Sequence, residues 1–578
     1  MSFDTLRIRV GRKPITVVEM DLDFCGNTYS SAPCTAAIGV TGAAKCYNCF
    51  KTCQDTANFA KTAKTYRFTG ETSFPPIGEA ILPCIRSVDI APTQIDTSGF
   101  SVSASVSVEL KDFPHHDRGV DPYTDDRPGP PSGTFFGRLR SRNPYMENRV
   151  MRVMTGYIDD DRTIFTQTRT YFIDRMEGPD ANGRVRIIGK DALRFADAEK
   201  AKAPAVSKGS LSANISNSAT SLTLLPSGVG ATYPSSGTVK IDDEVITFSS
   251  RSGDTLNGLT RGTDGTSAAA HSAATKVQQC IRYTSATVPA ILYDLFNTYA
   301  GLDSAYLPLA DWIDENDTWL GAFTSTVLLT EPTGVKDLLK EIIEATGCLI
   351  WWDEIAAEMK FKVLVPPLPS TPPPVLNESQ HFLAGSITVK DLPGERVSQV
   401  VMYFAPTGVA IDLKPENFKS ISIQVDATSE GENAYGTPIA RTILNRWVPS
   451  LQLADEIGAR ILKRYAETPR RITFRLDAKD ATLRTGDLVD VSSRLIQGFD
   501  GQPNLTRCLV TESREAEVGT VYEYTAIQAA STVGSAALIA PDGTPDWTGS
   551  TEEQRRTYMY ISNASGLMPD ASTGPVII

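Results

Sequence analysis

Five of the nine cysteines in this 578-residue chain lie within its first 53 positions, and thiols are the side chains best suited there to metal chemistry. Cys46, Cys49 and Cys53 belong to the stretch CYNCFKTC, and Cys25 and Cys34 precede it. If that stretch were helical, spacings of three and seven residues would place its three thiols on one face. The beginning of the chain lacks the apolar core of a signal peptide, so a reducing compartment is expected. Clustered thiols there are more often metal ligands than disulfides.

The spacing of these thiols leaves two metal centres open. No histidine precedes His115, so the ligands would all be thiolates. A zinc ribbon normally presents two CxxC pairs, and this region holds one, at 46–49. Irregularly spaced soft ligands suit an iron–sulfur cluster better, with zinc as the alternative. Five candidates for four positions leave one cysteine spare.

Other patterns with catalytic or binding chemistry are sparse. The chain lacks the HExxH, GxSxG, Walker A and GxGxxG motifs, so no enzyme activity is predicted. His115, His116 and Asp117 adjoin, but a solvated loop with local Asp turns explains them better than a metal site does. Trp351 and Trp352 could stack on a sugar, although one of two such strand tryptophans usually enters the core.

Charge and hydropathy argue against two broad classes, nucleic-acid-binding proteins and membrane-inserted proteins. There are 56 Lys and Arg against 68 Asp and Glu, a formal net charge of −12. Neutralising phosphates requires basic residues, so DNA is expected only in transit and not as a tightly held partner. No run of about 18 apolar residues occurs, so no stable membrane insertion is expected.

The elements that must position the thiols indicate a multidomain chain, mainly β with α+β parts. Alternating patterns such as 101–113 and 395–404 predict strands, and 288–301 and 335–347 predict helices that each end at a glycine. Residues 348–365 predict a hairpin, 471–493 predict two strands around a turn, and PPLPSTPPP (366–374) predicts an extended linker. The expected units are a small Cys-rich domain (1–78), a β-barrel (79–205), an inserted β module (206–283), an α+β unit (284–380), a second β-rich unit (381–535) and a C-terminal extension (536–578).

The order CGNTYSSAPC, then CYNCFKTC followed by QDTANF, resembles the cysteine-rich domain of lambda-like minor tail protein L. The resemblance covers about 50 residues and all five cysteines. GTFFGRLRSRNPYMENRVMRVMTG is similar, more weakly, to the β-domain of phage baseplate hub and gene-transfer-agent hub proteins. This chain differs from the lambda pattern in carrying the cysteine-rich segment at its N-terminus.

That resemblance implies a structural hub protein at the tail tip of a long-tailed bacteriophage, assembled in the host cytoplasm. It implies a [4Fe–4S] cluster on Cys25, Cys34, Cys46 and Cys53, with Cys49 as a possible alternative ligand. It further implies β-barrel hub domains and a homotrimer that closes the tail tube and takes part in genome delivery. The implied partners are the distal tail protein, the tape measure protein and a central fibre or receptor-binding protein. A zinc-stapled structural protein and a carbohydrate-binding tail component are the alternatives.

Overall fold

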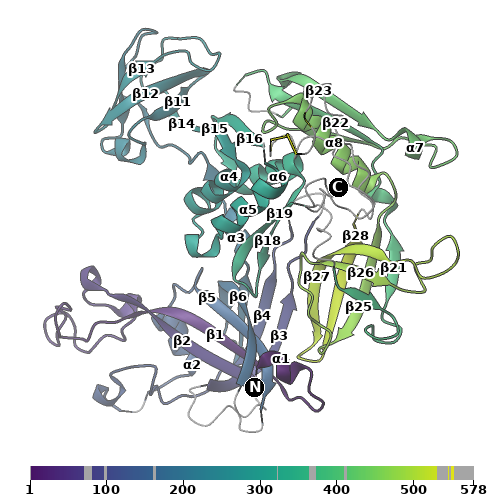
Figure 1. The fold of residues 1–578 in the computed structure, drawn as a ribbon. Coiled ribbons are helices and arrows are strands. Elements are labelled where there is room, and N and C mark those ends of the chain that lie inside the picture. Colours follow the sequence, from purple (N-terminus) through teal and green to yellow (C-terminus); the bar gives the residue numbers. More distant parts are fainter. Residues whose placement is uncertain are drawn as a thin grey trace.

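The structure is a computed structural model that describes residues 2–70, 81–96, 101–129, 131–159, 164–321, 323–363, 373–408, 413–529, 545 and 548–551. The linker expected at 366–374 and the extension expected at 536–578 fall almost wholly outside these residues. The described part is built from sheets and fewer helices, which confirms the multidomain, mainly β class with α+β parts (Figure 1).

A closed seven-stranded barrel forms the N-terminal part, in the order β1-β2-β3-β4-β7-β6-β5. Its interior is packed with apolar side chains, among them Val18, Met20 and Phe68. Two helices accompany the barrel, α1 (Phe3–Arg7) and α2 (Phe135–Arg142). The strands are β1 (Pro14–Cys25), β2 (Lys61–Gly70), β3 (Ile81–Ala91), β4 (Ser105–Lys111), β5 (Val150–Ile158), β6 (Ile164–Glu177) and β7 (Arg184–Lys190).

The cysteine-rich segment belongs to this barrel. It connects β1 to β2, which pair antiparallel from Val17↔Thr69 to Cys25↔Lys61. The boundary expected at 78/79 therefore runs through the barrel, and residues 26–60 are an excursion from its first hairpin. Sequence reasoning missed this because β1 also pairs with β5 to close the barrel, and β5 is distant from β1 in sequence.

Residues 207–279 form a separate six-stranded sheet in the order β14-β11-β12-β13-β10-β9, at the upper left of Figure 1. It has its own core, which includes Val239, Ile241 and Phe248. The strands are β9 (Ser210–Leu211), β10 (Ser221–Leu225), β11 (Gly237–Ile241), β12 (Glu244–Ser252), β13 (Thr255–Thr260) and β14 (Gln278–Gln279).

Excision of residues 207–279 is expected to leave a folded remainder. The two connections of the module are neighbours: the side-chain amide of Gln278 donates to the carbonyl oxygen of Ala205 at 2.9 Å, and the amide of Gln279 donates to Oγ of Ser207 at 2.9 Å. A short Gly-Ser join therefore spans the gap without strain. The melting temperature of the remainder should stay within about 5 °C of the intact chain, measured by circular dichroism. Aggregation of the shortened chain would contradict this.

Helices and short sheets form the middle of the molecule. The helix ending at Gly347 and the hairpin that follows it are confirmed: Gly347 has φ +64°, and β18 pairs with β19. The first expected helix is α4 followed by a π-helical turn at Leu295–Tyr299. The elements are α3 (Leu193–Ala196), β8 (Lys202–Ala203), β15 (Ile281–Thr287), α4 (Val288–Asp294), α5 (Leu309–Trp319), β16 (Thr324–Leu329), β17 (Thr333–Gly334), α6 (Val335–Thr346), β18 (Cys348–Asp353) and β19 (Glu358–Val363).

Two further sheets complete the described chain. The first has the order β20-β26-β27-β28-β25-β21, and the second, β23-β22-β24, packs on helix α8. The strands expected within 471–493 exist as β25 and β26, but β27 and β28 separate them in the sheet. The elements are β20 (Val375–Asn377), β21 (Thr388–Asp391), β22 (Gln399–Pro406), β23 (Phe418–Val425), α7 (Ala427–Glu430), β24 (Ala440–Leu444), α8 (Leu451–Tyr465), β25 (Arg470–Asp477), β26 (Leu488–Ser492), β27 (Thr506–Glu517) and β28 (Val521–Gln528).

A buried polar network joins the barrel to these later parts. Arg169 on β6 lies 3.7 Å from Glu354, after β18, and 3.4 Å from Glu515 on β27. The hydroxyl of Tyr171 and the backbone amide of Thr93 each donate to Glu354 at 3.0 Å. Arg169, Glu354, Tyr171 and Thr93 are less than 10 % exposed, and the side chain of Glu515 is 4 % exposed. The network therefore fixes the barrel against the β18–β19 hairpin and against the sheet that contains β27.

Asp191, which follows β7, accepts from the hydroxyl of Thr93 in this network at 3.5 Å, and the stability of the junction is expected to fall as pH rises towards neutrality. Burial raises the pKa of Asp191 to about 7, against the hydrogen bonds that Ser103 and Ala104 donate to its carboxylate. The folded state therefore holds a proton that the unfolded state releases near pH 4, and this stabilisation is complete below pH 4 and lost as pH passes through about 7. The contribution is a slope of about 1.4 kcal/mol per pH unit between these limits. Asp191→Asn should flatten that part of the pH–stability curve measured by urea unfolding; an unchanged slope would contradict the assignment.

Candidate metal centre

The four cysteines Cys25, Cys34, Cys46 and Cys53 line one hollow in the excursion between β1 and β2. Other lining residues carry amide side chains, among them Asn27 and Asn48. All nine cysteines of the chain are free thiols in the structure. Four segments separated by up to 28 residues are thus brought to one place.

Cys49 does not line this hollow. It is 2 % exposed, its thiol donates to the carbonyl oxygen of Tyr47 at 3.3 Å, and Asn143 and Arg142 lie nearby. The stretch 46–53 is not a helix: only Phe50–Thr52 forms a single 3₁₀ turn. The condition under which the three thiols would share a helical face is therefore not met: Cys49 has extended backbone (φ −110°, ψ 145°) and is not among the residues that line the hollow.

Asn48, which lines the hollow, connects two of its walls through hydrogen bonds. Its side-chain amide donates to the carbonyl oxygens of Cys25 at 3.1 Å and Asn27 at 3.2 Å, and its own carbonyl oxygen accepts from the amide of Cys25 at 2.6 Å. Its φ of +52° lies in the left-handed region, which asparagine tolerates better than most residues. This residue thus ties the end of β1 to the CYNCFKTC stretch.

Side chains from the far end of the excursion fix the remaining turns. Asp55 accepts from the amide of Thr35 at 2.8 Å and from its hydroxyl at 2.9 Å, which lowers the pKa of Asp55. Gln54 donates to the carbonyl oxygen of Ala44 at 2.8 Å and accepts from the hydroxyl of Thr41 at 3.0 Å. The positions next to Cys34 and Cys53 are therefore fixed by hydrogen bonds in an excursion with little apolar core.

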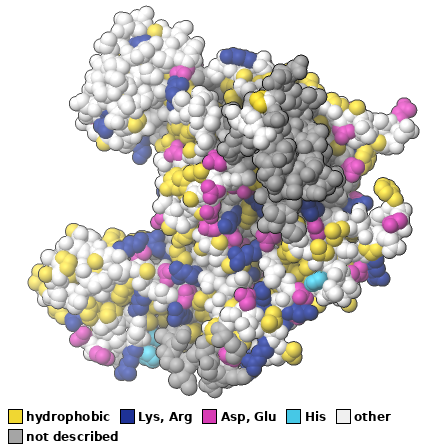
Figure 2. All heavy atoms as spheres, viewed as in Figure 1, with side chains coloured by type: hydrophobic (Ala, Val, Ile, Leu, Met, Phe, Trp, Pro, Cys, Tyr) yellow, Lys and Arg dark blue, Asp and Glu magenta, His cyan; other side chains and the backbone are white. Residues whose placement is uncertain are grey.

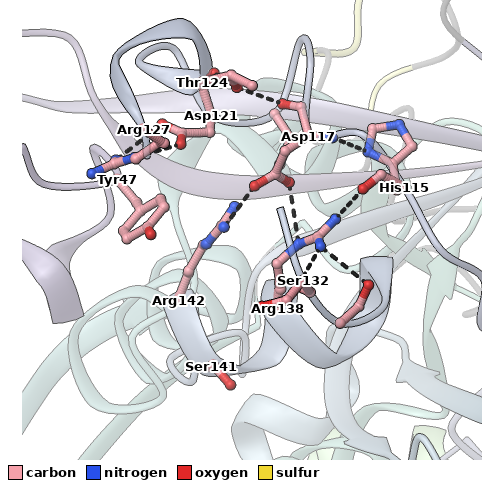
Figure 3. Close-up of polar contacts among 12 residues, drawn as sticks. Tyr47, His115, Asp117, Asp121, Thr124, Arg127, Ser132, Arg138, Ser141 and Arg142 are labelled. Atoms are coloured by element: carbon pink, nitrogen blue, oxygen red, sulfur yellow. Dashed lines mark hydrogen bonds and ion pairs between the residues drawn. The ribbon is translucent and has the colours of Figure 1, made fainter. Parts of the chain in front are cut away.

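Two arginines contact the thiol-bearing segment at Tyr47: Arg127, from the excursion between β4 and α2, and Arg142, at the end of α2 (Figure 3). These contacts are called here the clamp. The ring of Tyr47 lies between two guanidinium groups, 3.8 Å from that of Arg127 and 4.0 Å from that of Arg142. Arg127 also donates to the carbonyl oxygen of Cys46 at 2.8 Å and to that of Lys45. Sequence reasoning missed this clamp because Arg127 and Arg142 are 80 and 95 residues from Tyr47. The aromatic residue within the cysteine motif was the one local signal of it.

Two buried aspartates anchor the arginines of this clamp. Asp121 pairs with Arg127 at 2.9 Å, and Asp117 pairs with Arg142 at 2.6 Å and with Arg138 at 3.4 Å. Both aspartates are 3 % exposed. The expectation of a solvated loop around residues 115–117 is therefore wrong for Asp117: buried carboxylates require partners, and α2 supplies Arg138 and Arg142.

Burial and mutual repulsion disfavour free thiolates in the hollow. The pKa of Cys46 is raised, first by burial and then by the neighbouring Cys53, Cys34 and Cys25. The pKa of Cys53 is raised for the same reasons. A bound cation would reverse this balance, because metal binding replaces the protons of its thiol ligands.

The donor set of the hollow agrees with a four-iron cluster, which takes one thiolate for each iron. Four thiols and no histidine line it. No group of three or more His, Cys, Asp or Glu side chains within the described ranges is arranged to hold a metal ion directly. The residues present thus fit the cluster by number and type, and Cys25, Cys34, Cys46 and Cys53 are the ones that would hold it.

The other candidate sites lie elsewhere and have structural explanations. Trp351 is 5 % and Trp352 1 % exposed, so neither ring offers a face to a sugar. Trp352 donates to the carbonyl oxygen of Thr170 at 3.0 Å. Acidic and basic side chains are interspersed on the face in Figure 2, and the 207–279 module shows few charges there. Among the described residues, no helix has the length and apolar character needed to cross a membrane.

Comparisons with known proteins find similarity in structure alone. No protein-family model matches the chain, and a search of curated proteins finds no match. The 43 kDa tail protein of prophage MuSo2 from Shewanella oneidensis is similar over 77 % of this chain and 97 % of its own, at 10 % identity and a TM-score of 0.35. A tail protein from Neisseria meningitidis covers 76 % and 96 %, at 12 % identity and 0.35, and a chain of a gene transfer agent virion covers 76 % and 84 %, at 10 % and 0.27. At these TM-scores the likeness establishes neither a shared fold nor a shared function.

Proposed function

We propose that this protein is a structural hub subunit of a bacteriophage tail tip, stapled by a [4Fe–4S] cluster. The observation that carries the proposal is the convergence of Cys25, Cys34, Cys46 and Cys53 on one hollow, while Cys49 is buried and does not line it. The resemblance to lambda-like minor tail protein L implies the same four residues as ligands, on the basis of the sequence alone.

The cluster would act as a structural cross-link. When bound, it supplies iron–thiolate bonds to four chain segments. The chain itself orients these segments through Asn48, Asp55 and the arginines that enclose Tyr47. The described residues of the excursion bury few apolar side chains, Tyr29, Ala36 and Cys49 among them, and a segment with so little core commonly needs a metal to hold its shape.

The same proposal assigns a homotrimer at the tail tip, with the distal tail protein, the tape measure protein and a central fibre or receptor-binding protein as neighbours. Two β-rich bodies, the seven-stranded barrel and the six-stranded sheet β20-β26-β27-β28-β25-β21, would give three copies six positions around a tube. The role is non-enzymatic, with DNA passing in transit.

Metal and sulfide analysis of anaerobically purified protein tests the cluster. About four irons and four inorganic sulfides per chain are expected, with broad absorption near the visible range that oxygen bleaches. One zinc ion per chain without iron would contradict the cluster and would support a structural zinc site instead. Light scattering tests the assembly: a ring of a number other than three would contradict the trimer.

A further inference from the structure

The described part of the chain has a second cavity, which lies between the cysteine-bearing excursion and the barrel. Its volume is about 310 Å³, at the lower end of the range for ligand pockets. Three parts of the chain line it: strands β1 and β2, the excursion, and α2 with the segment that follows it. Its side chains divide into an apolar group with three aromatic rings and a charged group, and the site is called here the aromatic cavity.

Three rings form most of the apolar part of the aromatic cavity. Phe50 lies edge-on to Phe59, with ring centroids 5.2 Å apart, and edge-on to Tyr145, with centroids 6.2 Å apart. Leu22 is buried, whereas Phe50 and Tyr145 are 47 % and 55 % exposed. A pocket for a small molecule usually encloses most of its ligand, and these half-exposed rings leave the cavity open on one side. It therefore suits a side chain carried by a protein segment that runs over the surface.

Positive charge exceeds negative charge in the same cavity. Its lining includes three cationic side chains and one carboxylate, that of Asp23. The guanidinium of Arg142 is already paired with Asp117 at 2.6 Å (Figure 3). The other two cations share Asp23, which lies 2.5 Å from Arg149 and 3.2 Å from Lys61. The cavity thus keeps one positive charge that its own residues do not balance, on a chain whose net charge is −12.

Backbone hydrogen bonds fix both aromatic walls of the cavity. The amide of Cys53 donates to the carbonyl oxygen of Phe50 at 3.1 Å and closes the 3₁₀ turn that carries this ring. Tyr145 precedes Met146, which is buried and whose carbonyl oxygen accepts from the amide of Arg149 at 3.2 Å. A site that is formed before its ligand arrives loses little conformational entropy on binding.

We propose that the aromatic cavity binds an acidic segment of a partner protein. An aromatic side chain of that segment packs against Phe50 and Tyr145, and a neighbouring carboxylate pairs with Lys61. Lys61 is the available cation because its side chain is 61 % exposed, while Arg149 continues to pair with Asp23. The negative charge of the rest of the chain disfavours the same segment elsewhere. The inference rests on the proposed role as a structural subunit and assigns one of its surfaces to a partner.

Fluorine NMR of a defined peptide with the full-length, anaerobically purified protein tests the site. The probe is a blocked pentapeptide with para-fluorophenylalanine between two aspartates and a glycine at each end. Its fluorine line should broaden on binding, with a dissociation constant of about 1 mM or lower. The same peptide with two asparagines should bind about tenfold more weakly, because it lacks the charge-assisted contact with Lys61. No binding of the acidic peptide, or equal binding of both peptides, would overturn the inference.

Substitutions in the protein locate the binding. Tyr145→Ala and Lys61→Gln are each expected to raise the dissociation constant of the acidic peptide about three- to tenfold, because one removes a ring contact and the other a charge. Lys51→Gln removes an exposed charge from the same excursion, and Phe499→Ala removes a wholly exposed ring. Neither Lys51 nor Phe499 lines the cavity, so both controls should leave the constant unchanged. Equal constants in all four variants would overturn the inference.

Iron and sulfide analysis of the same samples separates this inference from the proposed cluster. Protein with a full iron content that does not bind the acidic peptide overturns the cavity and leaves the cluster standing. Protein without iron that binds the peptide as expected supports the cavity and contradicts the cluster. With benzoylphenylalanine in place of the fluorinated residue, photo-crosslinks should form to residues 50–61 or 142–149; crosslinks confined to other segments would overturn the inference.

Discussion

Replacing Cys46 with serine is expected to reduce the iron and sulfide content of anaerobically purified protein about tenfold or more, whereas Cys49→Ser should leave both unchanged. Cys46 lines the hollow with three other thiols, and Cys49 is buried beside Asn143 and Arg142. Loss of one ligand also removes stability, because the binding energy of a structural metal centre is folding energy. The Cys46→Ser protein should therefore aggregate at temperatures at which the Cys49→Ser protein stays soluble.

Two variants make this comparison sharp. Cys53→Ser should behave like Cys46→Ser, because it removes another thiol from the same hollow. Cys84→Ser changes a barrel cysteine that is 2 % exposed and controls for the effect of a buried hydroxyl on folding. Iron retained by Cys46→Ser and lost from Cys49→Ser would show that the ligand assignment is wrong.

Asp117→Asn is expected to lower the free energy of unfolding by about 3–5 kcal/mol, the range for breaking a buried ion pair by removing one partner. The side chains of Asp117, Arg138 and Arg142 are 4 %, 12 % and 11 % exposed, so the substitution leaves two guanidinium groups short of their anion. Asparagine is chosen because Asp117 has φ +66°, a conformation that asparagine also adopts. Urea unfolding, and the rate at which a protease cleaves within residues 26–60, would measure the effect.

The exposed Asp125 of the same excursion provides the control. Asp125→Asn removes the same charge from a neighbouring position and should change stability by less than about 0.5 kcal/mol. Equal effects of the two substitutions would mean that the net charge of the excursion matters and the buried pair does not.

Local features were predictable from the sequence because they depend on neighbouring residues. The helix that stops at Gly347 needs only an apolar stripe and a residue that accepts φ +64°, and the hairpin that follows needs only two short strands around a turn. The four thiols that line the hollow were also identified beforehand, from the order of the cysteines and their resemblance to a known motif.

Features that depend on distant partners were not predictable in the same way. Strands β25 and β26 each alternate clearly, yet each pairs with a strand from further along the chain, because alternation marks a strand and says nothing about its neighbour. The sequence around Asp117 predicts an exposed loop, because its ion-pair partners Arg138 and Arg142 lie more than 20 residues further along the chain, on α2. The position of the cysteine segment within the barrel likewise required the pairing of β1 with β5.

The sequence by itself determined the mainly β composition, since alternating residue types mark strands over short spacings. It also predicted the inserted module from its composition, and the resemblance to a known motif predicted which four thiols are ligands. The tertiary structure decided that Cys49 is buried outside the hollow that the other four thiols line, that arginines enclose Tyr47, and that the isoleucines of β23 face outward. A period of two residues defines two faces of a strand, and only packing against α8 selects which of them is buried.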